Sequence, residues 1–99
     1  MTPEEAQARV DEALNEVFCG ESGANRYLAF GSLDPKEQRV RLTKLIQATL
    51  DAANYGAMPP ARAELAFRVM AKVLEPYRPD ISETCRLKAR RLRKMLRGT

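Results

Sequence analysis

The sequence contains no histidine and no tryptophan, and it has only two cysteines, Cys19 and Cys85. Histidine is the commonest general base and a frequent metal ligand, and a structural zinc site needs four nitrogen or sulfur ligands. Two cysteines far apart supply neither a zinc site nor a disulfide framework. We therefore expect no metal and no cofactor, and we expect both cysteines to behave as small buried apolar residues.

Serine is also scarce, and none of the three serines lies in the sequence context of a nucleophile elbow. Residues 20–23 read Gly-Glu-Ser-Gly but lack the lysine and the following Ser or Thr of a phosphate-binding loop. The carboxylates of the N-terminal segment fall on the expected solvent side of a helix, which disfavours paired acid–base catalysis. The sequence therefore predicts a protein that is not an enzyme.

Long apolar runs are missing as well. No stretch approaches the roughly 18 apolar residues that span a membrane, and no apolar run follows a charged N-terminal segment as in a secretory signal. We therefore expect no membrane association and a cytoplasmic protein. The 99 residues, 44% of them hydrophobic, are enough for one domain with a real but shallow core.

Four segments carry apolar residues at the helical period, and none shows the alternation of a strand. Thr2 and Asp34 each precede a proline at the first helical position and a glutamate three residues further on, which is a strong helix start. Asp80 and Glu83 suggest a third capping box, and Gly98 a left-handed C-terminal cap. We predict an all-α, compact four-helix bundle-like domain, with helices at about residues 3–19, 35–55, 60–75 and 81–97 and a Gly/Ser-containing loop at about residues 20–34.

The third of these segments is the most apolar. Its apolar arc covers about half of the circumference, whereas a surface helix needs a stripe of only ~100°, so we expect this helix to be the most buried. Phe67 falls at the margin of the expected core side, which is made up of Leu65, Ala66, Val69, Met70, Val73, Leu74 and Tyr77. A helix-turn-helix around residues 55–60 is disfavoured, because Arg62 stands where an apolar residue is needed and the second helix is too apolar to read bases.

Charge is distributed very unevenly along the chain. The net charge is +4, from 17 basic and 13 acidic residues. Residues 1–21 carry six acidic side chains and one basic, whereas residues 78–99 carry eight basic and two acidic, a net +6. Such polarisation indicates either an acid–base partnership inside the fold or two surfaces with different partners.

The last segment reads as a basic amphipathic helix, with Ile81, Cys85, Ala89, Leu92 and Leu96 on its apolar side. Like charges three or four residues apart repel by roughly 0.2–0.5 kcal/mol per pair, so the pattern favours an anionic partner. Leu87 falls among the basic residues. The candidate binding residues are Arg86, Arg90, Arg91, Arg93, Lys94 and Arg97, with Lys88 and Leu87.

Two functions follow from this helix. The leading hypothesis is a small nucleic-acid-binding module that contacts phosphates. The alternative is a protein-interaction module, an inhibitor or adaptor docking on an acidic or nucleic-acid-binding protein of a larger bacterial assembly, with Arg26, Tyr27 and Phe30 as a second contact surface. A homodimer is a further possibility. The simplest interpretation is a solvated helix face whose charge is neutralised by the acidic first helix, and only the fold distinguishes these cases.

Overall fold

Four helices account for nearly all of the described chain, and the all-α prediction is confirmed. The computed structural model describes residues 1–18 and 33–98, with helices α1 (Pro3–Phe18), α3 (Pro35–Asn54), α4 (Pro60–Leu74) and α5 (Pro79–Arg97). No strand occurs within these ranges. The radius of gyration is 13.6 Å, close to the value of about 13 Å expected for a folded domain of 100 residues. Most of the expected loop at residues 20–34 lies outside the described residues.

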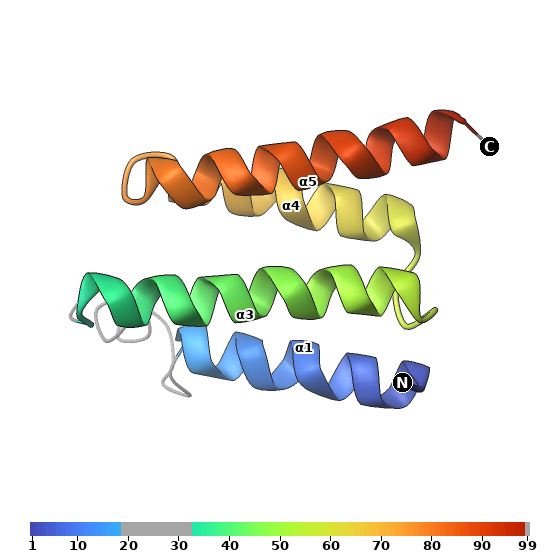
Figure 1. Ribbon diagram of the computed structural model, residues 1–99, viewed down its shortest axis with the longest axis horizontal. Helices are drawn as coiled ribbons and strands as arrows, with labels where there is room; N and C mark the ends of the chain where they lie inside the picture. Colours follow the sequence, from blue (N-terminus) through green and yellow to red (C-terminus); the bar gives the residue numbers. More distant parts are fainter. Residues whose placement is uncertain (19–32, 99) are drawn as a thin grey trace.

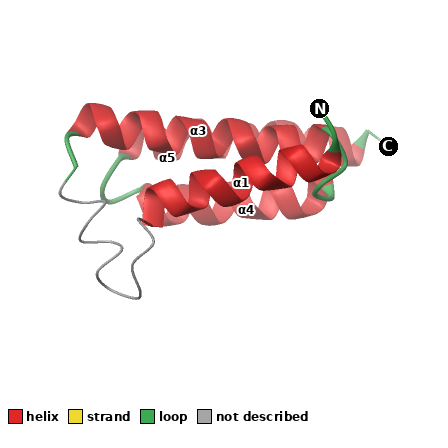
Figure 2. Ribbon diagram, turned by 90° about the horizontal axis from the view of Figure 1, so that it is seen from below, coloured by secondary structure: helices red, strands yellow, loops and turns green. Residues whose placement is uncertain are grey.

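The helices run up and down as two hairpins (Figure 1). α1 packs mainly against α3, and α4 packs mainly against α5. α3 joins the two hairpins through contacts with α4 and, less extensively, with α5. Figure 2 shows the same arrangement from below, with α1 and α3 on the near side and both chain ends at the same end of the bundle. α1 and α5 therefore belong to different hairpins.

Two of the predicted helix starts are confirmed at the level of single hydrogen bonds. The Thr2 hydroxyl accepts a bond from the Glu5 backbone N–H at 3.2 Å. The Asp34 carboxylate accepts one from the Lys36 backbone N–H at 3.0 Å. These side chains satisfy backbone donors that have no partner within the first turn of a helix, and this is why α1 and α3 begin where they do.

α3 ends at Asn54, close to the predicted end at about residue 55. Gly56 has φ +81°, a left-handed conformation in which an L side chain is strained. The Ala57 backbone N–H donates to the Ala52 carbonyl at 2.9 Å, which is the six-to-one bond of a Schellman motif. This turn reverses the chain into α4.

The predicted caps of the last helix are wrong, although the helix ends at Arg97, as expected. α5 begins at Pro79, and its N-terminal flanking residue, Arg78, makes no side-chain capping bond. Because proline is well suited to the first helical position, the helix starts before Asp80, whose carboxylate forms a salt bridge with Arg78 at 3.1 Å instead of capping. At the other end Gly98 has φ −77°, so it continues the right-handed conformation.

Arg78 also ties the second hairpin to the first. One of its terminal nitrogens donates to the Pro35 carbonyl at 3.0 Å and to the Gln38 side-chain oxygen at 3.3 Å. The hydrogen bond from Arg78 lowers the pKa of the Asp80 carboxyl below its usual value. The start of α5 is thereby fixed against the start of α3.

The predicted core side of α4 is only partly confirmed: Met70 and Leu74 pack against the core but are only partly buried. Phe67 is completely buried, together with Ala63 and Ala71, whereas Leu65, Val69 and Val73 are about half exposed, at 51%, 54% and 49%. The expected most buried helix therefore leaves a row of large apolar side chains in solvent. A helix that is apolar around half of its circumference has more than one possible core side, and its own periodicity does not decide between them.

Close packing against α5 explains the choice. The α4 residues that flank Phe67 on the buried face are alanines, and α5 presents Ser82, Cys85 and Ala89, all buried. These small residues allow the two helix backbones to come close together. The Ser82 hydroxyl donates to the Ala71 carbonyl of α4 at 2.6 Å, a direct bond from one helix to the backbone of the other. Phe67 then supplies the bulk that fills the space between the hairpins.

We predict that Phe67→Ala lowers the free energy of unfolding by about 3–5 kcal/mol, the usual loss when a buried Phe is truncated. Leu65→Ala, at the position expected to be core from the sequence, should change it by only about 0.5 kcal/mol or less. Urea denaturation followed by circular dichroism measures both. Equal losses for the two variants would contradict the observed orientation of α4.

Candidate nucleic-acid interface

The apolar side of α5 is largely as predicted. Ile81, Cys85, Ala89 and Leu92 are buried, whereas Leu96 and the neighbouring Met95 are exposed. Figure 1 shows why the last turn differs: the C-terminal end of α5 extends beyond the other three helices. Burial raises the pKa of the Cys85 thiol to about 11, so this cysteine is a neutral apolar group at physiological pH. Cys19 lies outside the described residues.

The acidic first helix does not cover the basic last helix. Two of its carboxylates are directed to α3, where Lys44 forms salt bridges with Glu16 at 2.8 Å and with Glu12 at 3.4 Å. The hydrogen bond that Lys44 donates to the Glu16 carboxylate raises the pKa of Lys44 above its usual value. Arg41 of α3 adds a bond to the Glu16 backbone carbonyl at 2.8 Å. The acid–base partnership inside the fold therefore joins α1 to α3, not to α5.

Two arginines of α5 are nevertheless paired within the second hairpin. Arg93 donates to Glu64 of α4 at 3.0 and 3.2 Å. Arg86 pairs with Glu75, just after α4, and with Glu83 of its own helix, each at 3.2 Å. The predicted row of basic side chains is therefore only partly uncompensated, and these two residues are held against α4.

The remaining cations of the row have no salt bridge within the described residues. Arg90, Arg91, Lys94 and Arg97 are exposed, and Lys88 is half-buried. We call Arg90, Arg91, Lys94 and Arg97 the free basic cluster. Leu87, 46% exposed, stands among its members because it is three, four and seven residues from Arg90, Arg91 and Lys94. The expected second surface, Arg26, Tyr27 and Phe30, lies outside the described residues.

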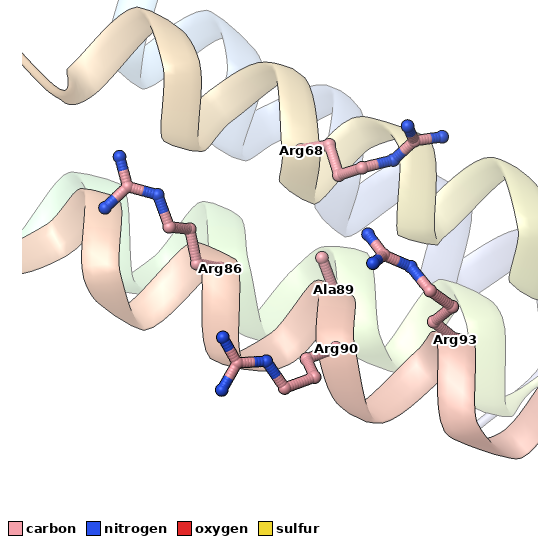
Figure 3. A pocket seen from close by; sticks show the side chains of 5 residues that line it. All are labelled: Arg68, Arg86, Ala89, Arg90 and Arg93. Atoms are coloured by element: carbon pink, nitrogen blue, oxygen red, sulfur yellow. The ribbon is translucent and has the colours of Figure 1, made fainter.

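A pocket lies between α4 and α5, lined by Arg68, Arg86, Ala89, Arg90 and Arg93, with a volume of about 170 Å³. In Figure 3, the Arg68 side chain runs along α4, and Arg86 and Arg93 extend toward α4 from α5, with Ala89 between these two. Arg90 points away from α4 at the edge of the pocket. We call this the arginine pocket.

Glu64 organises one side of the arginine pocket. A single carboxylate oxygen of Glu64 accepts from the Arg68 Nε at 2.8 Å and from the Arg93 Nη2 at 3.0 Å. The Glu64 side chain is only 9% exposed, whereas both guanidinium groups are about half exposed. A buried carboxylate needs such partners, because an unpaired charge is costly to bury.

Arg68 is the pocket residue that the sequence analysis missed. Glu64 is the one acidic residue in the fifteen-residue α4, and Arg68 follows it at the i,i+4 spacing of a helical ion pair. A single acidic residue in a helix whose other charged residues are all basic is a signal that it pairs with a cation. That signal indicates the pair, but the convergence of Arg93 from α5 depends on how the helices pack.

Within the described ranges, no group of three or more Cys, Asp or Glu side chains is arranged to hold a metal ion. No helix among the described residues is both long and apolar enough to cross a membrane. Comparison with protein-family models, curated proteins and solved structures finds no significant match to this chain. The interpretation of α5 therefore rests on its own geometry and charge.

We predict that Glu64→Gln destabilises the protein by about 1–3 kcal/mol, because it leaves Arg68 and Arg93 without their shared carboxylate. This range is below that for a fully buried pair, since both arginines are half exposed to solvent. Glu75→Gln is the matched control: Glu75 is an exposed partner of Arg86, so its loss should change stability by less than about 0.5 kcal/mol. Urea denaturation measures both variants, and equal effects would contradict the organising role of Glu64.

Proposed function

We propose that the protein is a small, non-enzymatic cytoplasmic module that binds nucleic acid through the free basic cluster of α5. The observation that carries this proposal is the partition of charge. Two carboxylates of α1, Glu12 and Glu16, are engaged by Lys44 of α3, while four exposed cations in the second half of α5 have no salt bridge within the described residues. A cluster of like charges of this kind repels itself and is relieved by an anionic partner.

The size of the cluster fits a few phosphates of one strand. From Arg90 to Arg97 a helix rises about 10 Å, at about 1.5 Å per residue. Phosphates of one duplex strand advance about 3.4 Å each along the axis, so the cluster matches about three of them. Arginine and lysine contacts of this kind position a protein on the backbone without reading sequence. We therefore propose binding with little sequence preference.

Binding should weaken steeply with salt. Three neutralised phosphates of duplex DNA correspond to a slope of about −2.7 in a plot of log K against log salt, or about a 40-fold loss of affinity between 50 and 200 mM. Arg90→Glu/Arg97→Glu should lower the affinity by about tenfold or more at 50 mM salt. Fluorescence anisotropy of a labelled 20-base-pair duplex measures the affinity and the slope.

The matched control is Arg9→Glu/Arg39→Glu, which makes the same change in net charge at exposed positions of α1 and α3. This control should lose far less affinity, because the effect is local to α5. Arg93 is not a suitable target, since its replacement by Glu would place a second carboxylate beside Glu64. No binding at 50 mM salt, or equal losses for the two double variants, would reject the proposal.

A specific observation favours a second candidate function, a protein-interaction module. Leu65, Val69 and Val73 form an exposed apolar row along three turns of α4, and the basic residues Arg68 and Lys72 lie beside it. The occupant that fits is an amphipathic helix of another protein, with an apolar ridge and an acidic flank. A second copy of this chain fits less well, because the basic flanks of two α4 helices would meet and repel each other.

For this second candidate, Val69→Asp should abolish capture of an acidic protein partner from a nuclease-treated lysate. Val40→Asp is the matched control, because Val40 is equally exposed but lies on α3. Light scattering at tens of micromolar tests whether a second copy of this chain occupies the apolar row. In that case the protein would be a dimer, and Val69→Asp would convert it to a monomer. Capture that both variants preserve would overturn the role of the apolar row.

A further inference from the structure

We infer that the arginine pocket between α4 and α5 is a binding site for a single phosphate group, and that it anchors the nucleic acid on α5. That the pocket binds an anion does not depend on the proposed function. That the phosphate belongs to a nucleic acid rests on the proposed function. The residues that carry the inference are Arg68, Arg86, Arg90 and Arg93 around Ala89.

The guanidinium groups of the pocket keep donors to spare. Each guanidinium carries five N–H donors. Arg68 uses its Nε for Glu64, which leaves both of its terminal nitrogens without a bond among the described residues. Arg93 uses Nε and Nη2, which leaves Nη1, and Arg90 has no ion-pair partner there at all. The pocket therefore offers donors from two helices to an incoming acceptor.

These donors are held in place before any ligand arrives. Glu64 fixes Arg68 and Arg93 from the buried side, and Glu75 and Glu83 hold Arg86 from the exposed side. A side chain that is already ordered loses less conformational entropy on binding, so the same contacts give a higher affinity. Glu64 thus both neutralises part of the charge and positions two of the donors.

The volume of the pocket decides the class of ligand. At about 170 Å³ it is smaller than the roughly 300–1,000 Å³ of sites that enclose drug-sized molecules. This size, together with the guanidinium lining, favours a compact anionic group. A phosphate group is compact and presents several acceptor oxygens to guanidinium donors, which bind it in bidentate fashion.

The pocket also continues into the free basic cluster. Arg90 lies at the pocket edge, and Arg97, seven residues later, lies on the same face of α5 two turns further on. A nucleic-acid strand that places one phosphate in the pocket would therefore lie along α5. Its next phosphates would contact Lys94 and Arg97. This places the tightest contact at one end of the interface.

Arg68→Ala and Lys72→Ala test the inference without altering α5. Both remove one exposed positive charge from α4, four residues apart, but only Arg68 lines the pocket. Arginine side-chain N–H resonances are followed by NMR while inorganic phosphate is added. In the same variants, anisotropy measures the affinity for a single-stranded dT12 oligonucleotide with a 5′-phosphate or a 5′-hydroxyl. Urea denaturation verifies that Arg68→Ala is still folded.

We expect phosphate to shift the Arg68, Arg90 and Arg93 resonances, and Arg68→Ala to weaken oligonucleotide binding about tenfold while Lys72→Ala changes it less than about twofold. If the 5′-phosphorylated strand binds more tightly than the 5′-hydroxyl strand, the pocket holds a terminal phosphate. If the two strands bind equally, the pocket holds an internal phosphate. Both results support the inference. Equal losses for the two variants, or no response of the pocket arginines to phosphate, would overturn it while leaving nucleic-acid binding intact. Phosphate binding without oligonucleotide binding would support the anion site and reject the proposed function.

Discussion

The buried carboxylate of Glu64 is the interaction on which the charged surface of the second hairpin depends. It lies on α4, faces α5, and accepts hydrogen bonds from one arginine of each helix. Two half-exposed guanidinium groups thereby become parts of a defined geometry. Without that carboxylate, Arg68 and Arg93 would be two like charges facing each other across a close helix contact.

The same reasoning explains why the basic face is not uniform. Cations near α4 meet the carboxylates of that hairpin, whereas cations further round α5 or beyond the end of α4 meet none within the described residues. The acidic residues that would neutralise them lie on α1, and α1 is occupied with Lys44 and Arg41 of α3. Because α1 pairs with α3 and α4 pairs with α5, the acidic residues of α1 are kept away from the basic residues of α5. An all-α fold with the alternative pairing, α1 against α5, would have had no such surface.

The sequence predicted what depends on local chemistry. Most helix limits and the Thr2 and Asp34 caps follow from residues within four positions of one another, and the part of the chain that the structure describes confirms them. The start of α5 is the exception, because Pro79 and Asp80 offer two competing local signals and the proline prevailed. The buried face of α4 could not be predicted from the sequence of α4. It was decided by the small residues of α5, which accept Phe67 and its flanking alanines and leave the Leu65 row outside.

The candidate site shows the same division. The basic amphipathic character of α5 is a property of one segment, so periodicity sufficed to identify Arg90, Arg91, Lys94 and Arg97. Which arginines are paired depends on the partner helix, so Arg86 and Arg93 could not be distinguished from the others by sequence. The distinction has a chemical meaning. A guanidinium paired with a carboxylate is ordered but partly neutralised, and it favours one contact of defined geometry. An unpaired guanidinium keeps its full charge, and it favours less specific attraction to a polyanion. α5 carries the first kind, Arg86 and Arg93, on the side that faces α4, and the second kind on the rest of its exposed surface, so an anionic chain lying along the helix would meet both.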